Sequence, residues 1–317
     1  MQTYLLAALV AFFISLFFCF FLIPILRRLK AGQNILVYVK EHKSKGGTPT
    51  MGGLAFITAA VVASIVFVKK ADRTFVLTLA IGLAYMAVGL LDDFLKRKHK
   101  ENLGLKAWQK FAFQTAIAVA AGGYCIRAGL TRLHVPFFGV TFELGWWILP
   151  LAVFVFLATV NAVNLTDGLD GLASGVSVPF FLSLGIIVSL QAGNSAVSTL
   201  CFALVGALLA YLLFNVSPAS VFMGDTGSLA LGGFAASIGV FTGNALYIAI
   251  VGMPFVFSVI SVIIQVIYYK ATGGKRVFLM APVHHHFQEK GYSESKISYA
   301  YFVISLIAGA ACVVTIL

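Results

Sequence analysis

Long apolar segments alternate with short polar ones along the whole chain of 317 residues. A helix needs about 20 apolar residues to cross the hydrocarbon core of a membrane. The pattern therefore predicts an all-α integral membrane protein, a single polytopic domain over residues 1–317 with about ten transmembrane helices. The expected spans are residues 4–26, 51–68, 74–91, 111–130, 146–163, 172–190, 197–214, 228–241, 245–268 and 299–317.

The composition excludes a soluble domain. Hydrophobic residues make up 60% of the chain and charged residues 10%, whereas soluble domains carry about 25% charged residues. The first apolar segment lacks a basic leader and a cleavage site of small residues, so we expect it to be retained as a span. The cysteines lie inside apolar segments without CxxC spacing, which favours small core residues over disulfides or a zinc site. They are Cys19, Cys125, Cys201 and Cys312.

Charged residues gather on one side of the predicted membrane. Segments 27–50, 92–110 and 269–298 hold 17 of the 22 lysines and arginines, which by the positive-inside rule makes this side cytoplasmic. Both termini are then outside, and five loops are cytoplasmic. Nine of the eleven acidic residues lie on the same side, although no topology rule requires it, which indicates a polar site there. The net charge of +11 lies in loops beside spans, so we expect no nucleic acid partner.

Two local features bear on the architecture. Residues 132–145 alternate apolar and polar side chains around Phe138-Gly139, which predicts a short hairpin on the outer side. Pro254 lies within the ninth span and should kink or break it, because proline removes a backbone hydrogen bond. Such a bend could open a groove for a long acyl chain or be an ordinary kink tolerated by helix packing.

Asp92 and Asp93 stand where the third span enters a basic loop. Neighbouring residues on a helix point about 100° apart, so the two carboxylates are expected to have different roles. A carboxylate at a membrane boundary is costly, which favours a functional role. The alternative is a solvated start of the loop.

A second polar cluster recurs every third residue at the end of the fifth span. Its Gly168 and Gly171 would let the backbone approach a ligand. Carboxylate and amide oxygens without histidine or cysteine suit a hard cation such as Mg²⁺. As packing contacts alone, these side chains would need four polar partners inside the bundle. They are Asn161, Asn164, Asp167 and Asp170.

Two further clusters lie on the same side. In Asn215 to Ser228, Asp225 at the start of a helix offers one carboxylate to a metal, and Phe222 either stacks on a flat ring or is an ordinary buried aromatic.

In the loop from Gly273 to Gly291, three consecutive histidines diverge too much for a single zinc ion and are better suited to hydrogen bonds with a diphosphate. The four clusters together indicate phosphoryl chemistry on a nucleotide-activated substrate, with a lipid as the other reactant.

These residues resemble the bacterial phospho-N-acetylmuramoyl-pentapeptide transferases, within the polyprenyl-phosphate N-acetylhexosamine-1-phosphate transferases. The histidine triplet after Ala281-Pro282 is similar to the muramoyl-pentapeptide branch rather than the N-acetylglucosamine branch. One departure is Gln288, where many members have an acidic residue, although Glu289 follows. The matching motifs are Thr48 to Gly53, Asp92-Asp93, Asn161 to Gly175, Asn215 to Ser228 and Met280 to Gly291.

The resemblance implies a ten-helix homodimer in the bacterial cell membrane with a cytoplasmic active site. It implies transfer of phospho-MurNAc-pentapeptide from UDP-MurNAc-pentapeptide to undecaprenyl phosphate, giving lipid I and UMP, with Mg²⁺ as cofactor. This reaction belongs to peptidoglycan synthesis, and so to cell wall biogenesis, cell shape and cell division. The resemblance further implies that nucleoside inhibitors could target the protein.

The resemblance also implies residue roles. Asp225 resembles the Mg²⁺ ligand, and the expected catalytic set is Asp92, Asp93, Asp225 and His284. The diphosphate region is expected to be lined by Asn164, Asp167, His284, His285 and His286. The nucleoside pocket is expected to comprise Lys45, Gly168, Leu169, Asp170, Asn215, Phe222 and Gln265, and the other expected substrate-binding residues are Thr50 and Asn161.

Two mechanisms and two other functions remain as alternatives. A lipid phosphate has a second pKa of about 6, so direct attack on the β-phosphorus needs no strong base and is favoured over a covalent intermediate on Asp225 or Asp92. An aromatic prenyltransferase would need two similar Asn/Asp repeats, and only Asn161 to Asp170 has that form. A transporter would place acids at mid-span, whereas these lie at the cytoplasmic ends.

Overall fold

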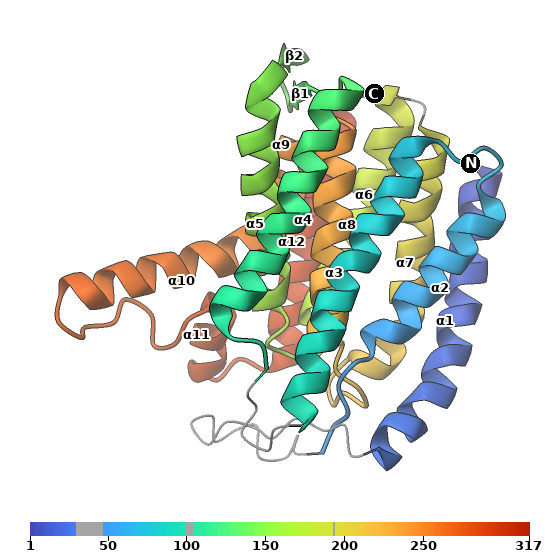
Figure 1. The fold of residues 1–317 in the computed structure, drawn as a ribbon. Coiled ribbons are helices and arrows are strands. Elements are labelled where there is room, and N and C mark those ends of the chain that lie inside the picture. The colour runs from blue at the N-terminus through green and yellow to red at the C-terminus, as the bar shows by residue number, and fades with distance from the viewer. Residues whose placement is uncertain (30–46, 99–103, 193) are drawn as a thin grey trace.

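The computed structural model describes residues 1–29, 47–98, 104–192 and 194–317. Within these ranges the chain is a bundle of α-helices with one small hairpin (Figure 1). The elements are α1 (Gln2–Arg28), α2 (Gly53–Phe67), α3 (Arg73–Lys98), α4 (Ala107–Ala128), β1 (Arg132–Val135), β2 (Val140–Glu143), the 3₁₀ helix η2 (Gly145–Trp147), α5 (Ile148–Thr166), α6 (Leu172–Ala192), α7 (Ser195–Asn215), α8 (Gly224–Phe241), α9 (Ala245–Val251), α10 (Met253–Ala271), α11 (Val283–Glu289) and α12 (Glu294–Val314).

The helices match the predicted spans closely. Each of the ten predicted segments falls on a helix, except that segment 245–268 is divided between α9 and α10. Among the described residues, seven helices are long and apolar enough to cross a membrane, and α2, α4 and α8 are the predicted spans outside that set. The prediction of an all-α, multi-pass membrane protein is confirmed. The short helix α11 lies in what the sequence predicted as a loop.

The break between α9 and α10 occurs where the sequence predicted it. Gly252 ends α9 and precedes α10, and Pro254 stands in the first turn of α10, where a missing N–H costs no helical hydrogen bond. In Figure 1, α10 leaves the bundle and projects sideways. Much of its apolar surface is exposed, including Ile263 and Ile267, as expected of a helix covered by lipid.

The two ends of the bundle differ. The hairpin and both chain termini lie together at one end, and α11 lies toward the other (Figure 1). In the hairpin β1 and β2 pair antiparallel, with Arg132 opposite Glu143 and Val135 opposite Val140, which confirms the predicted turn around Phe138-Gly139. The ends of α3 and α5 and the start of α8 meet at the end away from the hairpin.

Helix α8 forms the centre of the bundle. All of its residues are buried, and α3 and α5 pack along it. Small residues make this packing close, as in many membrane helix interfaces. A Cβ atom at Gly232 would lie 2.5 Å from the Cα atom of Val160, and one at Gly233 would lie 2.5 Å from the ring of Tyr85.

Replacing Gly233 with valine should destabilise the fold. Tyr85 is fully buried and donates a hydrogen bond to the backbone of Gln114 at 3.0 Å, so its ring cannot give way freely. Overpacking of this kind costs about 1–3 kcal/mol. Thermal unfolding in detergent should show a lower Tm for Gly233→Val. Gly175→Ala is the control, since its new methyl group meets nothing within 4 Å; equal Tm values for the two variants would contradict the packing argument.

Candidate active site

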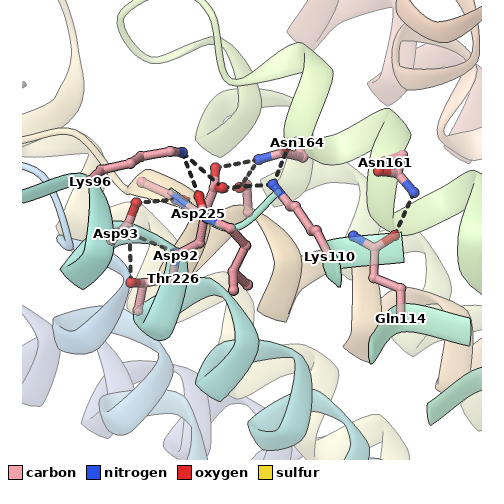
Figure 2. Close-up of polar contacts among 12 residues, drawn as sticks. Asp92, Asp93, Lys96, Lys110, Gln114, Asn161, Asn164, Asp225 and Thr226 are labelled. Atoms are coloured by element: carbon pink, nitrogen blue, oxygen red, sulfur yellow. Dashed lines mark hydrogen bonds and ion pairs between the residues drawn. The ribbon is translucent and has the colours of Figure 1, made fainter. Parts of the chain in front are cut away.

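Three carboxylates from two helices meet at the end of the bundle away from the hairpin. Asp92 and Asp93 lie near the end of α3, and Asp225 lies in the first turn of α8. Oxygen atoms of all three lie within 4.8 Å of one another, and the three residues are buried. Gly89 permits this approach, because a side chain there would collide with the carbonyl oxygen of Asp225. Figure 2 shows the cluster.

Asp93 holds the start of α8. Its carboxylate accepts hydrogen bonds from the backbone N–H groups of Asp225 at 3.1 Å and Thr226 at 2.9 Å, and from the Thr226 hydroxyl at 2.7 Å. These N–H groups have no partner within the helix, and the negative charge suits a helix N-terminus. Gly224, at φ +69°, turns the chain tightly against Asp93. Asp93 therefore fixes the position of Asp225 through hydrogen bonds to the backbone at the start of α8.

Two lysines balance the other carboxylates. The Lys96 ammonium lies 2.6 Å from Asp92 and 3.0 Å from Asp225, and the Lys110 ammonium lies 2.6 Å from Asp225. Asn164 donates to the second oxygen of Asp225 at 2.8 Å. Asp92 also accepts from the Leu105 N–H at 2.7 Å. Every acid in this buried group has a cationic or hydrogen-bonded partner, as buried charges require.

In the sequence, Lys96 and Lys110 stand out only as part of the basic segment 92–110, which indicates topology. Lys96 lies four residues after Asp92 on α3, a helical spacing that could have suggested the pair. Nothing in the sequence relates Lys110, on α4, to Asp225 on α8. Sequence reasoning also missed Gln114, one turn beyond Lys110 on α4.

Asn161 faces away from the carboxylates. Its amide donates to the side chain of Gln114 and to the backbone of Leu157, both at 2.8 Å. Gln114 is 1% exposed, and its own amide nitrogen has no partner among the described residues. Asn161 and Gln114 thus pair one turn deeper in the bundle than Asn164 and Lys110 (Figure 2).

Two of the three consecutive histidines, His284 and His285, lie beside Gly168, and His286 points elsewhere. His284 is fully buried beside Gly168, where a Cβ atom would lie 2.7 Å from its Nε2 atom, and neither ring nitrogen has a partner among the described residues. His285 lies 3.0 Å from the Gln288 side chain, and His286 accepts from the Leu279 N–H at 3.1 Å. The ring centroids of His284 and His285 lie only 4.4 Å apart, so the predicted divergence is confirmed for His286 and is wrong for the other two.

Burial shifts the pKa values of two groups near this turn. It lowers the pKa of His284 to about 3, so the imidazole is neutral at pH 7. Burial and the nearby carboxylates of Asp225 and Asp93 raise the pKa of Asp167 well above its ordinary value. The turn that follows α5 thus faces a neutral imidazole on α11 and carries an acid that holds its proton more tightly than a free carboxyl group.

The predicted nucleoside residues are brought together in part. Asp170 accepts from the Ala219 N–H at 3.0 Å, and Asn215 donates to the carbonyl of Val221 at 2.9 Å, just before Phe222. The buried Leu169 is next to Asp170 in the chain, and the buried Thr50 lies against Gly224. Gln265 lies apart on α10, and Lys45 lies outside the described residues.

The departure at Gln288 has a structural reason. Its side chain lies between His285 and Glu294, with the Glu294 carboxylate at 3.4 Å. The other oxygen of Glu294 accepts from the backbone N–H of Asp170 at 2.9 Å. An acid at position 288 would face the Glu294 carboxylate, whereas a neutral amide bonds to it. Glu289 lines a cavity beside α10 instead, so it does not take the place of Gln288.

The donor set fits a hard divalent cation. The three carboxylates converge, and hard cations such as Mg²⁺ prefer carboxylate oxygens. Asn164 adds an amide oxygen in contact with Lys110 at 3.3 Å. Asp92 and Asp225 face the lysines, whereas Asp93 is occupied by the start of α8. A site of this kind can hold a metal ion and place two ammonium groups beside an anionic ligand.

Comparison with known proteins agrees with this chemistry. The Glycosyl transferase family 4 matches residues 74–243, and the phospho-N-acetylmuramoyl-pentapeptide-transferase signature 1 matches residues 45–57. The chain is 43% identical over 313 residues to the phospho-N-acetylmuramoyl-pentapeptide-transferase of Listeria monocytogenes serotype 4b (strain CLIP80459), covering 96% of both chains. It is 44% identical over 307 residues to the protein of that name from Clostridium botulinum (strain Eklund 17B / Type B), covering 96% of this chain and 94% of the relative.

Replacing Asp93 with alanine should destabilise the protein. The change leaves two backbone N–H groups and one hydroxyl without their acceptor, and each buried unsatisfied donor costs about 1–3 kcal/mol. Thermal unfolding in detergent should show a clearly lower Tm. Thr226→Val is the matched control, because it removes only the hydroxyl bond and should lower Tm less. A Tm for Asp93→Ala equal to that of the wild type would contradict the capping role.

Proposed function

The chain belongs to the phospho-N-acetylmuramoyl-pentapeptide-transferase family, and from this premise we propose that it transfers phospho-MurNAc-pentapeptide from UDP-MurNAc-pentapeptide to undecaprenyl phosphate. The products are lipid I and UMP, and the reaction belongs to peptidoglycan synthesis. The observation that carries the proposal is the buried cluster of Asp92, Asp93 and Asp225 with two lysines at one end of a membrane bundle.

Asp225 is proposed as the principal Mg²⁺ ligand, with Asp92 beside it. When bound, Mg²⁺ supplies positive charge that neutralises the diphosphate and the leaving UMP. Lys96 and Lys110 add two ammonium groups within 3.0 Å of Asp225, so they are placed to bind phosphate oxygens. Asp93 keeps Asp225 in position through the start of α8.

Direct attack of the lipid phosphate on the β-phosphorus is the proposed path. A phosphate monoester with a second pKa of about 6 is mostly a dianion at pH 7, so it needs no strong base. Asp92 orients this phosphate or accepts its residual proton. His284 is neutral and faces Gly168, so it can hydrogen-bond to the diphosphate. A phosphosugar–enzyme adduct trapped without lipid would instead support a covalent path through Asp225 or Asp92.

The proposal includes the membrane arrangement. A single ten-span domain with both termini outside places the carboxylates at the cytoplasmic face, where UDP-MurNAc-pentapeptide is available. The positive-inside rule supports this orientation, since 17 of 22 lysines and arginines lie in segments 27–50, 92–110 and 269–298, which this orientation assigns to that face. The exposed apolar surface of α10 supports contact with a polyprenyl chain. The protein is proposed to act as a homodimer in the bacterial cell membrane and to be a target of nucleoside inhibitors.

Substrate choice tests the proposed function directly. Purified protein with Mg²⁺ and undecaprenyl phosphate should release UMP from UDP-MurNAc-pentapeptide and form the lipid-linked product. UDP-GlcNAc should not be turned over. The lipid product is measured by thin-layer chromatography or mass spectrometry. Turnover of UDP-GlcNAc alone would assign the chain to another branch.

Replacing Asp225 should remove Mg²⁺-dependent turnover. Asp225→Ala removes a ligand and the partner of two lysines, so activity should fall about 100-fold or more, the scale for losing a major electrostatic contact in an active site. Circular dichroism and Tm check that the variant is folded. Asp72→Asn is the control, because Asp72 lies near the start of α3, bonded to Asn194 at 3.0 Å. Full activity in Asp225→Ala would exclude the metal role.

A further inference from the structure

A cavity of about 670 Å³ lies between α10, the loop that follows it and α11. This volume is within the range of ligand sites, about 300–1,000 Å³. Apolar side chains such as Val266 and Leu279 form part of its wall. The charged residues that line it are Lys270, Arg276 and Glu289. None of these belongs to the carboxylate cluster described above.

The wall of the cavity is held in a defined shape. Gln265 accepts from the backbone N–H groups of Val277 at 3.1 Å and Phe278 at 2.9 Å and donates to the carbonyl of Phe278 at 3.1 Å. Leu279 donates to the imidazole of His286 at 3.1 Å. The loop is thus tied to α10 on one side and α11 on the other. A site built this way is organised before its ligand arrives.

Helix α11 joins the cavity to the active site. His284, near its start, is buried against Gly168 in the turn that also carries Asp167, and Glu289, at its end, lines the cavity. A seven-residue helix is about 10 Å long. An extended peptide of five residues spans about 16 Å, so a stem on a sugar held near this turn is long enough to follow α11 to the cavity.

The charged side chains that line the cavity are complementary to the charged groups of a peptide. The stem of the proposed donor is joined to the sugar through its N-terminus, so its free end is a carboxylate. Arg276 and Lys270 offer a guanidinium and an ammonium group to carboxylates. Glu289 offers a carboxylate to an amino side chain, and the apolar wall suits aliphatic ones. A lipid tail would match the apolar wall but not the three charges.

We propose that this cavity binds the peptide stem of the donor, with Arg276 and Lys270 facing its carboxylates. The proposal rests on the proposed function, because it takes the donor to be a nucleotide-activated sugar that carries a peptide. The stem adds binding energy distant from the reacting phosphorus, and the cavity makes the enzyme prefer donors that carry a peptide.

A comparison of two sugar donors, one with and one without the peptide, distinguishes peptide binding from other roles of the cavity. Steady-state kinetics at saturating undecaprenyl phosphate compare UDP-MurNAc-pentapeptide with UDP-MurNAc, which lacks the peptide. The variants are Arg276→Gln, Lys270→Gln and the double variant; glutamine at position 276 can still donate to the Leu279 carbonyl, which Arg276 contacts at 3.3 Å. If UDP-MurNAc is not turned over, its inhibition constant against the pentapeptide donor replaces kcat/KM.

The double variant should lose roughly tenfold or more in kcat/KM for the pentapeptide donor, the scale of one lost hydrogen bond to a charged group. Its value for UDP-MurNAc should not change. Lys275→Gln is the matched control, because Lys275 is exposed and adjacent to Arg276 but does not line the cavity. It should leave both donors unaffected.

Other outcomes overturn the proposal. Equal losses on both donors would assign the cations to the diphosphate or to folding, and unchanged values for both would exclude the cavity from donor binding. A raised KM for undecaprenyl phosphate alone would assign the cavity to the lipid. If the wild type turns over neither donor, the proposed function itself fails. If it turns over the pentapeptide donor and the variants behave alike on both donors, only the peptide site fails.

Discussion

The carboxylate of Asp93 at the start of α8 is the contact on which the site depends. It accepts from the backbone of Asp225 and Thr226 and from the Thr226 hydroxyl, which joins the end of α3 to the first turn of the central helix. Gly89 and Gly224 allow this approach because side chains there would collide with Asp225 and Asp93. The position of the Asp225 carboxylate is therefore set by helix capping, and α8 is held by packing on every side.

Charge balance is the second constraint. Three carboxylates within 4.8 Å of one another would repel strongly in a buried place, and Lys96 and Lys110 offset that repulsion. The same ammonium groups suit the anionic ligand of the proposed reaction. Residues that stabilise the protein without substrate are thus also the residues that would bind the diphosphate.

The sequence predicted most of the helices and the break at Pro254, because apolar length and proline chemistry are local properties. It also placed the acids at one end of the bundle. It did not predict the ion pair of Lys110 with Asp225, because that contact joins two helices that are distant in the chain. It also did not predict the bonds of Gln265 to the loop after α10, because a loop that folds back onto its own helix follows no periodic pattern in the sequence. The neutral side chain at position 288 is explained by its contact with Glu294, which the sequence alone does not show.

The pairing of α3 with α8 has a consequence for biogenesis. Asp93 and its partner Asp225 are 132 residues apart, and at about 5–20 residues per second a ribosome needs on the order of ten seconds to make that stretch. Lys96 lies one turn after Asp92, so this acid has its counter-ion as soon as α3 forms. Asp93 has no hydrogen-bond donors from α8 until that helix has been made. In a nascent chain arrested before α8, the Asp93 carboxylate therefore lies at the membrane boundary without the N–H groups that it binds in the folded protein. Membrane-insertion and quality-control factors would encounter the chain in this state, before any substrate binds.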